Sequence, residues 1–230
     1  KINIKFIEKH NIKPTDVWYP DFSRKDITEM REMFKGSDLK GLDLSQWDTS
    51  KVTDMTQIFY QARNIPEGVG NWNTSNVERM DFMLQEAENI PESIGNWNTG
   101  NVTSMTWMFN QSKNVPKSIG NWNTSKVRNM NGMFLKVART IPESIGNWNT
   151  SNVKIMDAMF SGAKYIPESI GKWNINSVRD MVGMFSEVQN IPESIGDWNT
   201  SNVESMFSMF KGAQNIPESI GNWDTSNVTS

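Results

Sequence analysis

The sequence predicts an α/β solenoid in which each coil contributes one short strand and one short helix. The first observation is a fixed period. Tryptophan recurs in steps of 25 residues, with one step of 26, at Trp47, Trp72, Trp97, Trp122, Trp148, Trp173, Trp198 and Trp223. The second is that apolar residues stand at fixed offsets from these tryptophans. A period of about 20 to 50 residues is typical of stacked architectures, because one unit cannot bury its apolar face alone.

The residues after each tryptophan predict the helix. In the unit that begins at Trp97, apolar residues follow at Val102, Met105 and Phe109. Most other units repeat these offsets of 5, 8 and 12, and usually add a small or apolar residue at offset 15. Such offsets follow one face of a 3.6-residue period, so we expect a helix of about two or three turns at NVTSMTWMFNQS (101–112) and its equivalents.

The residues before each tryptophan predict the strand. Proline in the repeated IPESIGNW prevents the helix from continuing. In the first unit, LKGLDLSQW (39–47), Leu42 and Leu44 alternate around Asp43, which indicates a short strand. Stacked strands of this kind would form a narrow parallel sheet. A glycine two positions before most tryptophans, such as Gly95, marks a bend or a close approach of neighbouring coils.

The period also divides the chain. We expect residues 1–21 to be an N-terminal capping segment, and residues 22–230 to be a solenoid of about eight coils, truncated at its C-terminus. The 26-residue step contains one extra residue in LKVART (135–140). An insertion there implies a loop or turn that tolerates it.

Composition excludes several classes of function. The net charge is −3, with 23 basic and 26 acidic residues and no long basic run, so we expect no nucleic-acid partner. The chain has no cysteine, and His10 is its one histidine. No nucleophile with a partner base can be assembled, so we expect neither an enzyme nor a metal or cofactor site. No apolar stretch reaches the roughly 18 residues that a membrane span needs.

The tryptophan column has two readings. It is either a sugar-stacking platform or part of the core, and its constant phase beside the other apolar columns favours a structural core ladder. Trp107 stands outside that phase, where other units have Gln57, Gly132 or Gly183. It is therefore a candidate contact residue for a partner.

The acidic residue of each IPES stretch forms a second candidate partner-binding set, interrupted by Lys117: Glu67, Glu92, Glu143, Glu168, Glu193 and Glu218. Stacking would bring these like charges close together, so we expect them to face solvent. They would bind a basic patch on a partner, or they would simply keep the solenoid soluble.

The Asn-Thr-Ser stretch, as at Asn149–Ser151, matches a glycosylation sequon in several units. Its regularity favours a structural role, in which these side chains satisfy turn backbone groups, cap the next helix and form ladders between coils. By contrast, the positions six, seven, nine and ten residues after tryptophan vary freely. Either these columns carry recognition residues or they drift without constraint.

The motif W-(D/N)-T-S-x-V-x-x-M-x-x-M-F and the stretch LKGLDLSQWDTSKVTDMTQIF (39–59) resemble the BspA-like family of bacterial leucine-rich-repeat surface proteins. The similarity is greatest to the 25-residue type of mollicute surface lipoproteins, and it covers residues 22–230. It implies a leucine-rich-repeat-like solenoid at an extracellular bacterial surface, with a lipid or wall anchor outside this sequence. This chain departs from the family by using IPESIG in place of the usual FNQDIS link, and no family site residues carry over.

These observations together predict a non-enzymatic surface repeat domain for protein–protein interaction or adhesion to host or neighbouring cells. Two alternatives stay open: a structural spacer that displays another domain, and a glycan-binding module that uses Trp107 and the Asn/Thr edge.

Overall fold

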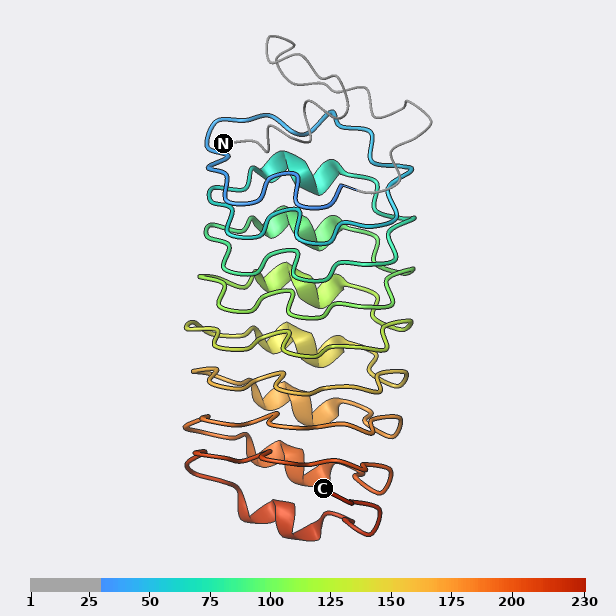
Figure 1. Ribbon diagram of the computed structural model, residues 1–230, viewed down its shortest axis with the longest axis vertical. Coiled ribbons are helices and arrows are strands. Elements are labelled where there is room, and N and C mark those ends of the chain that lie inside the picture. Colours follow the sequence, from blue (N-terminus) through green and yellow to red (C-terminus); the bar gives the residue numbers. More distant parts are fainter. Residues whose placement is uncertain (1–29) are drawn as a thin grey trace.

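The computed structural model describes residues 30–230, and these form a solenoid. Figure 1 shows the coils stacked one upon the next along the long axis, with their helical segments in one column. These segments are 3-10 helices: η1 Glu67–Asn71, η2 Glu92–Asn96, η3 Lys117–Asn121, η4 Glu143–Asn147, η5 Glu168–Lys172, η6 Glu193–Asp197 and η7 Glu218–Asn222. The stacked repeat predicted from the 25-residue period is therefore present. The expected cap at residues 1–21 lies outside the described residues.

The prediction of a strand before each tryptophan is wrong, because a 3-10 helix occupies that place. Pro142 is extended, with φ −72° and ψ 143°, and sits immediately before η4. The i→i+3 hydrogen bonds from Ile145 N–H to the Pro142 carbonyl and from Trp148 N–H to the Ile145 carbonyl then close the turn. Proline suits this position because its fixed φ is compatible with the start of a helix, where no N–H partner is needed.

The prediction of a helix after each tryptophan is also wrong. Residues 80–87 and their equivalents form a series of tight turns, which we call the turn ladder. Phe82 and Glu86 have φ values of 57° and 56°, which an α-helix does not allow. The N–H groups of Met83 and Gln85 bond within the coil, to the carbonyls three residues earlier. Those of Met80, Phe82, Leu84 and Glu86 bond instead to carbonyls of the next coil, at 2.8–3.1 Å.

The turn ladder nevertheless buries the residues that the helical pattern selects. Met80, Met83, Leu84 and Ala87 are all fully buried. Their offsets of 0, 3, 4 and 7 fit a repeating four-residue turn as well as a 3.6-residue helix. Over eight residues the two periods differ too little for hydrophobicity to separate them.

No sheet accompanies the turn ladder. Neighbouring coils pair in parallel through single residues, such as Asp54 with Arg79 and Arg79 with Ser104. Within residues 30–230 no such pairing extends into a strand, so the predicted narrow parallel sheet is absent from them. The cause is that alternate N–H groups of the ladder turn back within their own coil, which interrupts continuous extended pairing.

The core is a set of stacked columns. Seven tryptophans, from Trp47 to Trp198, are no more than 5% exposed, whereas Trp223 of the last described coil is only partly buried. The Trp122 and Trp148 rings stack with centroids 6.4 Å apart, and Phe109 and Phe134 stack at 5.8 Å. Each such column removes apolar surface from water only because the next coil covers it.

The glycine before each tryptophan permits a close approach of neighbouring coils. A Cβ atom placed on Gly146 would lie 2.5 Å from the Ser169 Cβ and 2.9 Å from the Ser169 carbonyl oxygen in the next coil. No larger residue fits there without moving one coil relative to the other. The close approach expected from the glycine pattern is confirmed.

Two walls of the solenoid hold neighbouring coils together in different ways. The helix wall is the 13-residue phrase from seven residues before each tryptophan to five after it, such as 141–153. From Ile65 onward in the described chain, backbone–backbone hydrogen bonds within this phrase stay in one coil. Side chains make its bonds between coils: Ser169 Oγ donates to the Glu143 carbonyl, and Trp173 Nε1 donates to the Ile145 carbonyl. In the turn ladder, the backbone makes these bonds.

Candidate functional site

The predicted acidic residues lie in one column at the first position of six 3-10 helices, and all six side chains are exposed. The carboxylates of four of them accept backbone N–H bonds from the next coil, namely Glu67, Glu92, Glu143 and Glu168. Glu143 Oε2 accepts a hydrogen bond of 3.1 Å from the Ser169 N–H, at the start of η5 in the next coil. Glu67 and Glu168 make the equivalent bond to Ser93 and Ser194. Each of these carboxylates therefore caps the helix of the following coil.

Glu92 makes the most complete cap. Its two carboxylate oxygens accept bonds of 3.0 and 2.9 Å from the N–H groups of Lys117 and Ser118. Burial raises the pKa of the Glu92 carboxyl, but these hydrogen bonds and the Lys117 charge outweigh that effect and hold the pKa below its ordinary value. Lys117 has no carboxylate, so it cannot cap η4 in the same way. The bond that remains between these two residues is the one that Ser144 Oγ donates to the Lys117 carbonyl, at 2.6 Å.

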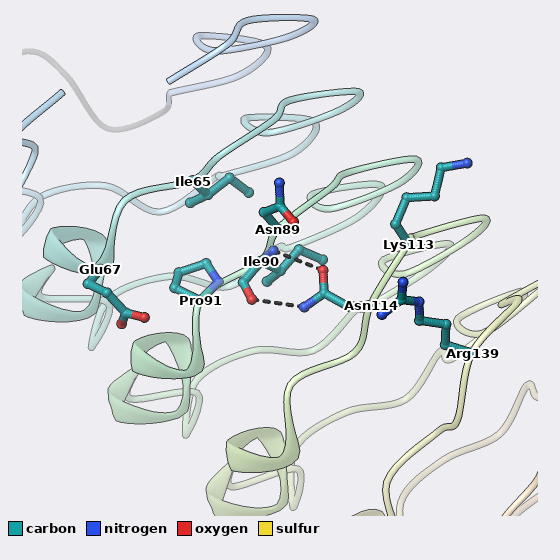
Figure 2. Close-up of a pocket in the computed structure, with 8 residues that line it drawn as sticks. All are labelled: Ile65, Glu67, Asn89, Ile90, Pro91, Lys113, Asn114 and Arg139. Carbon is teal, nitrogen blue, oxygen red and sulfur yellow. Dashed lines mark hydrogen bonds between the residues drawn. The ribbon is translucent and has the colours of Figure 1, made fainter. Parts of the chain in front are cut away.

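A pocket of about 420 Å³ opens beside this column. It lies between the link segments of successive coils, which are the short stretches that join each turn ladder to the following helix wall, such as 88–89 and 113–114. Ile65, Ile90 and Pro91 supply apolar walls, while Glu67 and Asn89 lie at its rim (Figure 2). The remaining lining residues are Lys113, Asn114 and Arg139, on the side away from Glu67.

The pocket adjoins an interrupted ladder of amides. Asn89 Nδ2 donates to Asn64 Oδ1 at 2.7 Å, and Asn215 Nδ2 donates to Asn190 Oδ1 at 2.8 Å. Between these pairs, Asn114 instead uses both ends of its amide on the Ile90 backbone, at 3.0 and 2.9 Å (Figure 2). Thr140 and Tyr165 then replace asparagine in the two coils that follow. The irregular stretch coincides with the inserted residue before Arg139.

Trp107 is half-buried rather than freely exposed. It has φ 59° and lies in the turn ladder, where its ring stacks on Phe82 with centroids 6.2 Å apart. On the other side it covers Gly132, whose Cβ position would lie 3.1 Å from the indole. The two rings form an aromatic pair on the outside of the ladder, separate from the buried tryptophan column.

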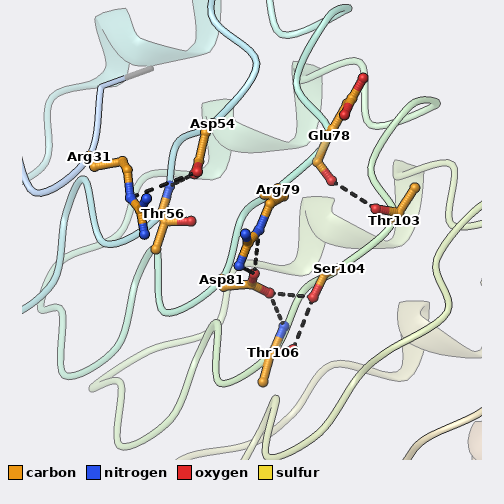
Figure 3. A network of polar contacts seen from close by, with 9 residues as sticks. All are labelled: Arg31, Asp54, Thr56, Glu78, Arg79, Asp81, Thr103, Ser104 and Thr106. Carbon is orange, nitrogen blue, oxygen red and sulfur yellow. Dashed lines mark hydrogen bonds and ion pairs between the residues drawn. The ribbon is translucent and has the colours of Figure 1, made fainter. Parts of the chain in front are cut away.

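A polar network lies at the turn ladder (Figure 3). Asp81 is buried, and its carboxylate accepts bonds of 2.9 and 3.1 Å from Arg79 and of 2.9 Å from the Thr106 N–H. Ser104 Oγ donates to the same carboxylate. The hydrogen bonds to Asp81, and its charge, raise the pKa of Arg79. All of these partners belong to two adjacent coils, so the network joins them.

Asp157 occupies the position equivalent to Asp81 but has no such partner. Ile155 stands where Arg79 would be, and the Asp157 carboxylate accepts a 2.9 Å bond from the Val182 N–H. Burial raises the pKa of Asp157; that hydrogen bond opposes the shift, and the charge of Asp180 adds to it. A carboxylate with a raised pKa is a frequent mark of a functional site. Asp157 does not line the pocket beside the acidic column.

The Asn-Thr-Ser residues act between coils. Thr150 Oγ1 donates to the Asn174 carbonyl at 2.9 Å, and Asn152 Nδ2 donates to the Ser125 carbonyl at 2.7 Å. Asn149 Oδ1 accepts the Ser151 N–H in a local turn. The predicted ladder is present, but no helix follows for these residues to cap.

Sequence reasoning missed Lys113, Arg139 and Lys164, which begin the link segments of three successive coils and are exposed. The available signal was the position nine residues before each tryptophan, which Lys113, Arg139 and Lys164 occupy in three successive units. Within residues 30–230 no cluster of acidic or histidine side chains is arranged to hold a metal ion. No helix in the same residues has the length and apolar character of a membrane span.

A family model described as "Mycoplasma protein of unknown function, DUF285" matches residues 28–140 and 136–230. No curated protein matches the chain. Solved structures with similarity include a leucine-rich-repeat protein of Leptospira interrogans, at 11% identity and a TM-score of 0.43, with 80% of this chain and 54% of that chain covered.

Two further solved structures match with lower TM-scores. The Arabidopsis receptor kinase HAESA, in complex with a peptide hormone and a co-receptor, is 16% identical with a TM-score of 0.38, covering 78% of this chain and 32% of that chain. An internalin from Listeria monocytogenes is 12% identical with a TM-score of 0.29, covering 82% and 72%. The alignments span about a third to a half of the first matched chains.

Proposed function

The chain belongs to this family of Mycoplasma proteins of unknown function, and from that premise we propose that its coils form a non-enzymatic repeat domain that binds another protein at an extracellular bacterial surface. The motif resemblance to BspA-like surface proteins supports this setting, and adhesion to a host or neighbouring cell is the role that we assign to it. The partner is a protein on that cell.

The observation that carries the proposal is the contrast between the two walls. On the helix wall, Ser, Trp, Thr and Asn side chains hold the coils together, and the sequence repeats almost without change. On the turn ladder the backbone does this, so exposed side chains can change without loss of the stack. Repeat proteins commonly place individual recognition residues on such a variable surface of a constant scaffold.

The experiment measures saturable binding of the purified chain to cultured host cells. A triple variant, Gln111→Gly, Lys136→Gly and Glu187→Gly, removes exposed ladder side chains from one column. Gly162 and Gly212 already occupy that column, with positive φ, so glycine is compatible with its backbone. We expect binding to weaken about tenfold, which corresponds to roughly 1.4 kcal/mol.

The matched control is Asn96→Ser, Asn121→Ser and Asn147→Ser, which changes three exposed residues at the ends of η2, η3 and η4. It should bind like the unmodified chain. Absence of saturable binding would favour a spacer. Binding that survives protease treatment of the cells and is lost with Trp107→Ala would favour a glycan partner, because Trp107 and Phe82 form a half-exposed aromatic pair. Either result would overturn the proposal.

A further inference from the structure

We propose that the pocket lined by Lys113 and Arg139, together with Lys164 in the next coil, binds an acidic segment of the protein partner. The inference rests on the proposed function and names the chemistry of the partner. We call Lys113, Arg139 and Lys164 the basic edge. An aspartate or glutamate side chain of the partner would enter the pocket, and neighbouring acidic residues would follow the edge along the stack.

The first support is the charge along one column. The residues in register at the start of the link segments run Asp38, Arg63, Glu88, Lys113, Arg139 and Lys164. Signs alternate as far as Lys113, which follows Glu88 of the preceding coil. Lys113, Arg139 and Lys164 are then all basic, and neighbouring coils in such a stack bring equivalent residues close enough for like charges to repel.

The second support is that no ion pair within residues 30–230 includes Lys113, Arg139 or Lys164, although Glu88 stands one coil before Lys113. The ion pairs within residues 30–230 join Arg31 with Asp54, Lys35 with Glu32, Arg79 with Asp81, and Arg179 with Glu204. The side chains of Lys113 and Arg139 make no hydrogen bond or ion pair within residues 30–230. The Lys164 side chain makes a cation–π contact, its Nζ lying 5.3 Å from the centre of the Tyr165 ring. Lys117, in the same coil as Lys113, replaces the acid found in the equivalent helices and adds to the local positive charge.

The third support is the shape and lining of the pocket. Its volume of about 420 Å³ admits a side chain. The methylene groups of a glutamate would contact Ile90 and Pro91, while its carboxylate would reach the ammonium of Lys113 or the guanidinium of Arg139. Arginine can bind a carboxylate through two parallel hydrogen bonds. Glu67 at the opposite rim would repel a second acid, which fixes where the first one enters (Figure 2).

The surroundings favour a protein segment over a uniformly charged polyanion. Glu67, Glu92, Glu143 and Glu168 form the neighbouring column and are exposed. A sulfated glycan or nucleic acid would bring dense negative charge against them. A protein segment can place acids at the basic edge and neutral residues beside the glutamates, so it avoids that repulsion.

The probe is a short fluorescein-labelled peptide in which Glu alternates with Ser, and its comparison peptide has Gln in place of Glu. Fluorescence anisotropy measures the Kd of both with the purified chain at low and moderate salt. We expect the Glu peptide to bind more tightly, and its affinity to fall as salt screens the pairs. Lys113→Gln with Arg139→Gln should weaken binding of the Glu peptide about tenfold.

Arg128→Gln with Lys154→Gln is the matched control. It removes the same charge from two exposed residues in adjacent coils on the other side of the turn ladder, and should change the Kd less than about twofold. Equal losses in both variants would show a general charge effect and overturn the inference. So would equal binding of the two peptides, or binding of a heparin-derived oligosaccharide at the basic edge without binding of the Glu peptide.

The two proposals can fail separately. A cell-surface protein that binds saturably, yet equally well after Lys113→Gln with Arg139→Gln, would leave the proposed function standing and overturn this inference. Neither the double variant Lys113→Gln with Arg139→Gln nor its control, Arg128→Gln with Lys154→Gln, removes an ion pair of the described residues. Both should therefore unfold at the temperature of the unmodified chain, and a change in binding would not reflect misfolding.

Discussion

The helix wall and the turn ladder run the length of the described stack and bury similar apolar residues, but their sequences behave differently. Phrases such as IPESIGNWNTSNV return almost unchanged, whereas the ladder accepts Phe82, Trp107, Gly132 and Ala158 at one position. This difference in sequence variability corresponds to a difference in which groups form the hydrogen bonds between coils. Side chains make them in the helix wall, and backbone groups make them in the ladder.

This comparison explains why the phrase repeats. A backbone hydrogen bond forms with any residue except proline, so it places little demand on sequence. A bond from a serine, threonine or indole group requires that residue type in each coil. The repetition therefore reflects construction of the stack, and it does not require multiple copies of a binding site.

The largest change in stability is expected where neighbouring coils approach closely in the helix wall. Gly146→Ala would place a methyl group against Ser169 and its carbonyl, and we expect a loss of about 1–3 kcal/mol in the free energy of unfolding, typical of overpacking. Gly221→Ala is the matched control, since no atom lies within 4 Å of its Cβ position. Urea unfolding compares the two. Similar losses would mean that contact between coils does not determine the choice of glycine.

A smaller effect is expected at the acidic column. Glu92→Gln should cost about 0.5–1 kcal/mol, because a neutral amide accepts the Lys117 and Ser118 N–H bonds less strongly than a carboxylate. Since the folded pKa of Glu92 is lowered, this stabilisation is present above the unfolded pKa and is lost as the pH falls through the folded pKa. Thermal unfolding at neutral and acidic pH measures the difference between the two chains.

Lys117→Glu is the reverse change at the next helix. It should provide η4 with the cap that η2, η3, η5 and η6 have and raise the unfolding temperature slightly. If Lys117→Glu destabilises the chain while Glu92→Gln does not, the acidic column is not a capping device.

The smallest effect is expected on the ladder. Asp157→Asn should stabilise the chain slightly near neutral pH, because burial disfavours the charged carboxylate. Since the folded pKa is raised, the penalty appears as the pH rises through that pKa, and the gain from asparagine should vanish below the unfolded value of about 3.9. Differential scanning calorimetry across this pH range provides the measurement.

Asp81→Asn supplies the matched comparison for Asp157→Asn. It removes the carboxylate that pairs with Arg79, so it should destabilise the chain at neutral pH. Effects of the same sign at the two positions would show that the position in the ladder, rather than the partner of the carboxylate, determines the outcome.

The stacked fold could be predicted because a period is a global property of the sequence. The elements within a coil could not be predicted from hydrophobicity, because a four-residue turn and a helix bury the same positions over so short a stretch. One signal was present: Gly132, Gly162, Gly183 and Gly212 stand at positions of the expected helix that have positive φ. The ordinary residues at equivalent positions, such as Phe82 and Gln111, concealed it.

The candidate site was predictable only in part. Exposure of the acidic column followed from charge repulsion, but its capping role depends on where each carboxylate lies relative to the next coil. The basic edge depends on which residues stand at one position of three successive coils, and its pocket adjoins the interruption of the asparagine ladder at Asn114. Neither can be read from a single 25-residue unit.

The tryptophan column has a spectroscopic consequence. Neighbouring indoles such as Trp97 and Trp122, or Trp148 and Trp173, stack with centroids 6.2 and 6.3 Å apart and ring planes within 11°. Chromophores held so close and nearly parallel couple their electronic transitions, and excitation passes readily between them. The folded stack should therefore show exciton bands in near-ultraviolet circular dichroism and strongly depolarised fluorescence. Opening at one coil would divide the array and alter both signals, so the core itself can report where the solenoid separates.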